Sequence, residues 1–237
     1  MSDAEHSVAA PVSGSTLPGT KVPGTALVIA ASTAGTLFEW YDFYLYGTLA
    51  PQLAKHFFPA ADPTAALLAV LASFGAGLIV RPLGGIAFGV MGDTIGRKRT
   101  FLVTIVLMGV STFGIGLIPT YAQIGVWSTV ILVALRMLQG MALGGEFSGA
   151  AVYVAEHAPA HRRGLHTGWL QTAGMIGFLL TMAVVAACEA LLGAERFESW
   201  GWRVPFLVSA VLIAISIGMR LKLDESPVFR AMLEQRR

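Results

Sequence analysis

The chain has 237 residues, of which 55% are hydrophobic and only 13% are charged, and its formal net charge is +2. Together with a mean hydropathy of +0.68, these values exclude a soluble domain of this length. The slight positive charge requires no nucleic-acid partner, because basic loops are expected in membrane proteins. Composition therefore predicts an integral membrane protein, and the single cysteine, Cys188, excludes an internal disulfide.

The first element in chain order is residues 1–25, a segment rich in Ser, Gly and Pro that predicts a disordered cytoplasmic tail. Six uncharged or nearly uncharged stretches follow, and roughly 20 apolar residues are enough to cross the hydrocarbon core as a helix. The predicted spans are 26–50, 65–89, 100–119, 128–153, 167–190 and 204–221. We therefore expect an all-α bundle of six transmembrane helices over residues 26–221.

The basic residues fall mainly on one side of this expected bundle. If the N-terminus is cytoplasmic, the inside bases are Lys21, Arg97, Lys98, Arg99, Arg162, Arg163, Arg220, Lys222, Arg230, Arg236 and Arg237. The outside bases are then only Lys55, Arg196 and Arg203. Because cytoplasmic loops carry an excess of Lys and Arg, both termini are predicted to lie in the cytoplasm.

One polar run, Gly89 to Arg99, interrupts the hydrophobic stretches between the second and third spans. It reads GVMGDTIGRKR, with glycines, one acid and three successive bases. Such a segment cannot lie in hydrocarbon, where its polar groups would have no partners. The run therefore predicts a short turn at which one membrane helix leaves the bilayer and the next re-enters.

The same run is similar to the signature between helices 2 and 3 of the major facilitator superfamily, although Thr94 stands where that loop commonly has a base. Arg136, Gln139 and Gly140 resemble the Arg-x-x-Gln-Gly motif on helix 4 of that superfamily. Three further stretches narrow the resemblance to the metabolite:proton symporter family. They are Glu39-Trp40-Tyr41-Asp42-Phe43 with Tyr46-Gly47, Arg81-Pro82-Leu83-Gly84-Gly85, and Leu143-Gly144-Gly145-Glu146.

Members of this family look like two six-helix halves joined by a cytoplasmic loop, so the chain resembles the N-terminal half, with 222–237 as the start of that loop. The resemblance implies a secondary active transporter in a bacterial-type inner membrane, which carries a small organic acid or zwitterion together with protons. The implied partners are the lipid bilayer and a missing C-terminal half or a second copy of the chain. The alternative is a fragment of such a symporter that inserts without transporting.

Three charged residues are expected at one depth in the membrane. Counted at about 1.5 Å per residue from the cytoplasmic helix ends, Glu39 lies about 20 Å, Asp42 about 24 Å and Arg136 about 25 Å along. In the resembled fold, helices 1 and 4 line the central cavity, so these three are candidate substrate- and proton-binding residues. The planar fork of Arg136 suits a carboxylate, and the two acids can hold a proton. A structural role for either acid, at a helix kink or bonded to backbone, stays open.

A second acid and base are expected nearer the cytoplasmic side. By the same counting, Arg81 on the second span lies about 12 Å and Glu146 on the fourth span about 11 Å from that side. Neither charge can be left bare in lipid, so the two are predicted to form a buried ion pair. For this pair, a structural role is favoured over a role in transport.

The resemblance also assigns a role to the polar run between the second and third spans. In the family this loop acts as a conformational latch, and the matching residues here are Gly89, Gly92, Asp93, Gly96, Arg97 and Lys98. Asp93 and Arg97 are expected to meet the other half of the transporter when the cytoplasmic side is closed. Opening would break those contacts, which is how two rocking halves alternate access.

Neither a metal site nor an enzyme is expected. The three histidines His157, His161 and His166 are predicted to be solvated loop residues, because Pro159 breaks the helical spacing between the first two. The chain lacks the His-Glu-x-x-His motif, the Gly-x-Ser-x-Gly nucleophile turn and the Gly-Lys-Ser/Thr phosphate loop. No cofactor is implied either.

Overall fold

The computed structural model describes residues 25–59, 62–157 and 160–221 of the chain. Within these ranges the side chains of 25–32, Arg97 and 146–153, among others, are not described. The predicted tail over 1–24 and the predicted loop over 222–237 therefore lie outside the described residues.

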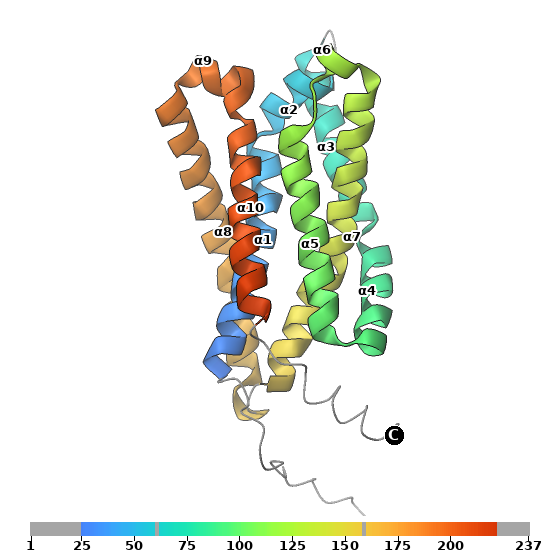
Figure 1. Cartoon of the computed structure of the whole chain (residues 1–237), viewed down its shortest axis with the longest axis vertical. Helices are drawn as coiled ribbons and strands as arrows, with labels where there is room; N and C mark the ends of the chain where they lie inside the picture. Colours follow the sequence, from blue (N-terminus) through green and yellow to red (C-terminus); the bar gives the residue numbers. More distant parts are fainter. Residues whose placement is uncertain (1–24, 60–61, 158–159, 222–237) are drawn as a thin grey trace, which may run out of the picture.

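The described residues form six long helical segments that run side by side as a bundle (Figure 1). The segments are α1 (Thr25–Thr48), α3 (Pro63–Ile79) continued by α4 (Arg81–Ile95), α5 (Arg97–Leu117), α7 (Val126–His157), α8 (Arg163–Leu192) and α10 (Arg203–Leu221). The short elements between them are α2 (Ala50–Phe57), α6 (Tyr121–Ile124), η1 (Ala160–Arg162), α9 (Ala194–Arg196) and η2 (Phe197–Gly201). The described residues contain no strand, and the expected all-α bundle is confirmed.

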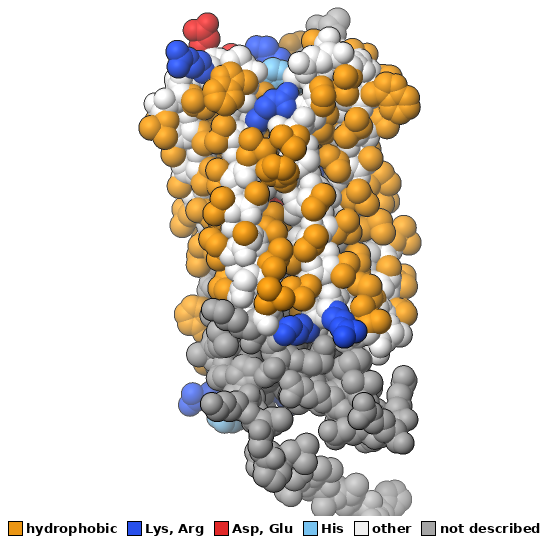
Figure 2. All heavy atoms as spheres, viewed as in Figure 1, with side chains coloured by type: hydrophobic (Ala, Val, Ile, Leu, Met, Phe, Trp, Pro, Cys, Tyr) orange, Lys and Arg blue, Asp and Glu red, His pale blue; other side chains and the backbone are white. Residues whose placement is uncertain are grey.

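Four helices in the described part are long and apolar enough to cross a membrane. They are Pro63–Ile95, Lys98–Leu117, Val126–Gly145 and Arg163–Leu192. A fifth span is formed by Ala194–Gly201 with Arg203–Met219, if this pair, bent by 66°, counts as one. The remaining long helix is α1, which carries Glu39 and Asp42. The outer face of the bundle in Figure 2 is covered by apolar side chains, with Lys and Arg gathered near its two ends.

The second segment is broken once, at Val80, which ends α3 and precedes α4. Pro82 follows at the second position of α4, where its missing N–H removes a backbone bond that a continuous helix would make. The helical path from Pro63 to Ile95 is nevertheless long and apolar enough to form one membrane span. The break therefore adjusts the direction of the chain close to Arg81 without ending the span.

The turn expected over Gly89–Arg99 is much shorter than predicted, and that prediction is wrong. Helix α4 continues to Ile95 and α5 begins at Arg97, so a single residue, Gly96, makes the turn. Its φ of 103° and ψ of 149° lie in a region that is essentially restricted to glycine. Polar residues mark where a helix leaves hydrocarbon, but they do not end the helix. The pattern therefore indicates the point at which the chain leaves the membrane, but not the position of the turn.

Helices α4 and α7 cross with their backbones in contact. A Cβ on Gly84 would lie 2.0 Å from the Met141 carbonyl oxygen, and a Cβ on Gly144 would lie 2.0 Å from that of Arg81. One turn away, a Cβ on Gly140 would lie 1.9 Å from the Gly77 carbonyl oxygen in α3. Small residues allow this approach, which replaces side-chain packing by direct backbone contact.

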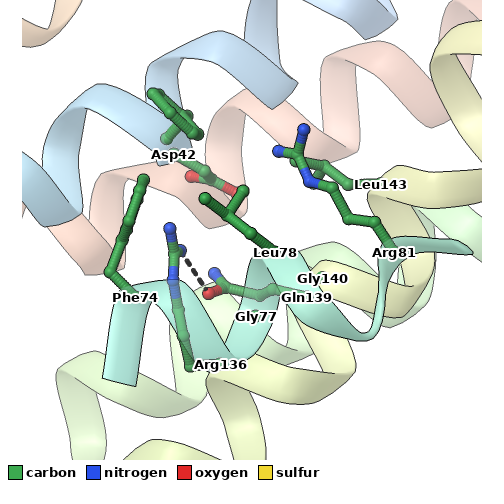
Figure 3. Close-up of a pocket in the computed structure, with 10 residues that line it drawn as sticks. Asp42, Phe74, Gly77, Leu78, Arg81, Arg136, Gln139, Gly140 and Leu143 are labelled. Carbon is green, nitrogen blue, oxygen red and sulfur yellow. Dashed lines mark hydrogen bonds between the residues drawn. The ribbon is translucent and has the colours of Figure 1, made fainter. Parts of the chain in front are cut away.

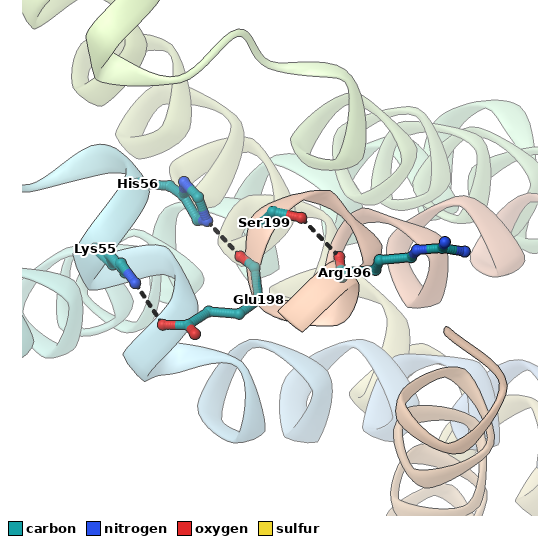
Figure 4. Close-up of polar contacts among 5 residues, drawn as sticks. All are labelled: Lys55, His56, Arg196, Glu198 and Ser199. Carbon is teal, nitrogen blue, oxygen red and sulfur yellow. Dashed lines mark hydrogen bonds and ion pairs between the residues drawn. The ribbon is translucent and has the colours of Figure 1, made fainter. Parts of the chain in front are cut away.

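At the end of the bundle where α2 and η2 lie, side chains hold the elements together (Figure 4). Lys55 of α2 forms an ion pair with Glu198 of η2, and His56 Nε2 lies 2.9 Å from the Glu198 carbonyl oxygen. The His56 ring also stacks on Trp202, with centroids 5.2 Å apart. Arg203 Nη1 donates to the carbonyl oxygens of Gly116 at 3.0 Å and Ile118 at 2.7 Å, which satisfies the last turn of α5.

We expect Gly140→Leu to destabilise the bundle, because the new side chain must push α7 away from the Gly77 carbonyl group. Overpacking of this kind costs about 1–3 kcal/mol. Thermal unfolding of the purified protein in detergent measures the change. The matched control is Gly168→Leu in α8, where nothing lies within 4 Å of the added Cβ. Equal unfolding temperatures for the two variants would contradict the close crossing.

We expect Gly96→Ala to destabilise the turn between α4 and α5 by about 1–3 kcal/mol, because a Cβ is strained at this backbone conformation. Gly89→Ala is the control, since that glycine lies inside α4 with open space around its added Cβ. The same unfolding measurement compares them. A Gly96→Ala variant as stable as Gly89→Ala would show that the single-residue turn is not required.

Candidate functional site

A buried cation lies at the centre of the bundle. Arg136 of α7 is only 6% exposed. The central carbon of its guanidinium group lies 4.3 Å from the centroid of the Tyr46 ring and 4.5 Å from that of Phe74. Both rings offer their negative faces to the cation, and such contacts contribute most when the cation is shielded from water. Helices α1 and α3 thus supply an aromatic lining for a base on α7, and Figure 3 shows Phe74 of α3 beside Arg136.

A chain of hydrogen bonds connects this cation to a buried acid. Arg136 Nη1 donates to Gln139 Oε1 at 2.8 Å, and Gln139 Nε2 donates to Thr112 Oγ1 at 2.6 Å. The Thr112 hydroxyl in turn lies 2.5 Å from Asp42 Oδ2 and donates to it. Every bond points from the positive end toward the negative end, so each one polarises the next. The chain joins α7, α5 and α1.

The Thr112 hydroxyl has a second acceptor within reach. Its Oγ1 lies 3.0 Å from the Met108 carbonyl oxygen, one turn earlier on α5. A hydroxyl group has only one proton, so Thr112 donates either to Asp42 or to its own helix. It accepts the bond from Gln139 in both cases. Thr112 is therefore a two-position link between the acid and the amide.

A small cavity adjoins these groups. Its volume is about 10 Å³, which is room for about one water molecule. Asp42, Arg136 and Gln139 line it together with Arg81 and Phe43. Figure 3 shows Asp42, Arg81 and Arg136 around the same space, although they come from three different helices. Two cations and a carboxylate thus share one enclosed polar site.

Glu39 is the second buried acid of α1, and it interacts with Arg81. Glu39 is 5% exposed and Asp42 is 4% exposed, so both acids of α1 are buried. Arg81 is within electrostatic reach of Glu39, and its guanidinium carbon lies 5.7 Å from the Phe43 ring centroid. The side chain of Glu146 lies outside the described residues. The Arg81–Glu146 ion pair therefore stays a prediction, and the described acids near Arg81 include Glu39 and, on the same cavity, Asp42.

The residues of the expected latch lie at the end of the bundle where α4 turns into α5. Asp93 is exposed on the last turns of α4, and Gly92 is buried beside it. Lys98 Nζ donates to the carbonyl oxygen of Leu221 at 3.0 Å, so it connects the start of α5 to the end of α10. The side chain of Arg97 is not described.

Two members of the hydrogen-bonded chain have no role in the sequence-based prediction. Gln139 follows Arg136 by three residues, and this spacing places both on one helix face, so the motif contained the signal. Thr112 lies in a stretch without charged residues and offers no such signal. Its position beside Asp42 depends on how α5 packs against α1.

Comparison with known proteins places this chain among transporters. A family model described as sugar (and other) transporter matches residues 27–237. The proline/betaine transporter of Salmonella typhimurium is 42% identical over 207 residues, which are 87% of this chain and 41% of that protein. The shikimate transporter of Escherichia coli is 42% identical over 199 residues, 84% of this chain and 45% of the relative. The chain thus spans less than half the length of these relatives.

Solved structures share the fold. The proton:xylose symporter XylE bound to 6-bromo-6-deoxy-D-glucose has a TM-score of 0.77 and 22% identity, and the match covers 86% of this chain and 46% of that one. The inward open conformation of XylE from E. coli gives a TM-score of 0.75 over 89% of this chain and 50% of the other. The family and these relatives are transporters, not enzymes. A family model matches nearly the whole chain, and the six-helix fold is shared with a solved major facilitator superfamily structure. This protein therefore belongs to the sugar (and other) transporter family.

Proposed function

We propose that this chain is the N-terminal six-helix half of a secondary active transporter that carries a small organic acid or zwitterion together with protons. The observation that carries the proposal is the buried chain from Arg136 through Gln139 and Thr112 to Asp42. The names of the relatives support the substrate class, since they are transporters of proline and betaine or of shikimate. Each of these molecules contains a carboxylate.

Arg136 is the proposed binding group for the substrate carboxylate. Its guanidinium has five N–H donors, and the bond to Gln139 uses one of them. A planar fork binds a carboxylate through two parallel bonds, which a single ammonium group cannot do. The aromatic rings of Tyr46 and Phe74 fix the plane of the fork before substrate arrives. Arg81, on the same cavity, supplies a second positive charge.

Asp42 is the proposed proton carrier, with Glu39 as the second candidate. When Asp42 is ionised, Thr112 donates to it and its negative charge compensates Arg136 through the chain. When Asp42 takes a proton, that compensation is lost and Thr112 can donate to Met108 instead. An uncompensated buried cation is costly, so a substrate carboxylate then restores the balance. Proton and anion are thereby bound together, which is the requirement for symport.

The other parts of the proposal concern the whole transporter. The protein lies in a bacterial-type inner membrane with both termini in the cytoplasm, because the basic residues are concentrated on that side. A second six-helix bundle, either a C-terminal half or another copy of the chain, completes the cavity and rocks against this one. Gly89, Gly92, Asp93, Gly96, Arg97 and Lys98 form the latch to that bundle. Arg81 and Glu146 form a pair within this one.

Joining this chain to the C-terminal half of the E. coli proline/betaine transporter tests the transport proposal. The joined protein is expected to accumulate labelled betaine or proline in vesicles with an imposed proton gradient. The chain alone is expected to show none, because alternating access needs two bundles. In the joined protein, Arg136→Lys should lower uptake at least about tenfold, since the bidentate bonds and ring contacts are lost.

The control for that experiment is Arg163→Lys, which keeps the charge of an exposed base at the start of α8. It should leave uptake unchanged. Full activity of Arg136→Lys would contradict a forked contact with the substrate carboxylate. Gradient-driven uptake by the chain alone, abolished by the same variant, would instead indicate a transporter formed by two copies.

Thr112→Val should uncouple the acid from the cation, because valine has nearly the shape of threonine but no hydroxyl group. The carboxylate of Asp42 then loses a donor, which favours its protonated form, so the pH of half-maximal uptake is expected to rise. Thr112→Ser keeps the hydroxyl group and should restore the original profile. Uptake measured between acidic and alkaline pH distinguishes them. If both variants lower uptake equally without a change in pH dependence, Thr112 has only a packing role.

A further inference from the structure

An apolar groove runs between α5 and α10 on the outer face of the bundle. Its volume is about 310 Å³. Its walls are formed by Val106, Gly109, Val110 and Phe113 of α5 and by Ala210, Ile213, Ala214 and Ile217 of α10. The two helices are in direct contact at its floor, where a Cβ on Gly109 would lie 2.4 Å from Ile213 Cδ1. The groove exists because glycine at this position lets α10 approach α5.

The groove opens away from the polar centre of the bundle. Val110 is 63% exposed, and the neighbouring Val211 of α10 is 61% exposed. Thr112 and Asp42, in contrast, are buried. The surface around the groove is apolar along its length, as Figure 2 shows for this face of the molecule. In a bilayer such a surface lies against lipid tails.

The stripe of α5 that forms one wall begins with a base. Arg99, Val103, Val106, Val110 and Phe113 follow one another at spacings of four and three residues, so they lie on one face of the helix. Arg99 is exposed at the end of this stripe. From Arg99, the groove extends between about 10 Å and about 21 Å along the helix axis. A hydrocarbon leaflet is about 15 Å thick, which matches the position of an acyl chain.

The basic end of this stripe, at Arg99, favours an anion. Helix α5 begins with three successive bases, has no acid in its first turn and no side-chain cap at Gly96. Positive charges at a helix N-terminus are unfavourable, because the helix dipole is positive there. Asp93, on the end of α4, offers one negative charge against the three bases. A phosphate group close to Arg99 supplies one further negative charge and accepts from the backbone N–H groups.

We propose that this groove binds one acyl chain of an anionic phospholipid, with the phosphate group held by Arg99. Lys98 already connects the two helices that form the walls, through its bond to the Leu221 carbonyl oxygen. The lipid therefore contacts α5 at its head and both helices along its tail. This site lies outside the proposed transport site and requires neither transport nor a second bundle.

Native mass spectrometry of the purified chain tests the site, with phosphatidylglycerol and phosphatidylcholine of identical acyl chains as probes. The chain is expected to retain phosphatidylglycerol about fivefold more tightly than phosphatidylcholine, because one basic side chain near an anionic headgroup contributes about that factor to the affinity. Arg99→Gln should remove this preference. Ala214→Phe should weaken retention of both lipids, because the ring fills the groove from an exposed position.

Two matched controls separate the site from general lipid binding. Arg163→Gln removes an exposed base from the same end of the bundle, and Ala187→Phe places the same ring on an exposed position of α8. Both are expected to bind lipid as the unmodified chain does. Equal retention of the two lipids by the unmodified chain would overturn the headgroup contact, and so would equal effects of Arg99→Gln and Arg163→Gln. Equal effects of Ala214→Phe and Ala187→Phe would overturn the groove.

Discussion

A guanidinium group that is 6% exposed within a membrane bundle is the constraint on which the centre of this structure depends. The charge of Arg136 cannot be left without compensation in a medium of low polarity. Two aromatic rings, one amide, one hydroxyl and one carboxylate meet that requirement, and they come from α1, α3, α5 and α7. The helices of the bundle are thus connected through the partners of one side chain.

The second requirement is that these partners stay close together. Glycines at 77, 84, 140 and 144 let α3, α4 and α7 approach until their backbones touch. Arg136 is one turn from Gly140, so the crossing also sets the distance between the cation and the cavity. At the far end, the contacts of Lys55, His56 and Arg203 fix α2, α10 and the end of α5 relative to one another. Backbone contact beside the cavity and side-chain contacts at one end of the bundle therefore support the polar centre.

The sequence predicts the bundle well because hydropathy and the positions of charges are properties of single segments. Helix rise likewise predicts one depth for Asp42 and Arg136, and these two side chains are connected through Gln139 and Thr112. The part that sequence patterns miss is set between segments. Thr112 has no sequence signal because its role comes from the rotation of α5. The extent of α4 beyond Gly89 is missed because polar residues can continue a helix after it leaves hydrocarbon.

The backbone contact between α4 and α7 limits how the proposed substrate site, which contains Arg81 and Arg136, can change its affinity. Helices that touch along their main chains cannot rotate independently, so Arg81 and Arg136 move as parts of one rigid body. Their mutual distance is then the same whichever side of the membrane the cavity faces. In the proposed transporter, a difference in substrate affinity between those two states would arise from groups across the cavity, from water entry or from the charge of Asp42. Under the proposed function, the protonation state of Asp42 thus changes within this bundle, whereas the helix crossing stays the same.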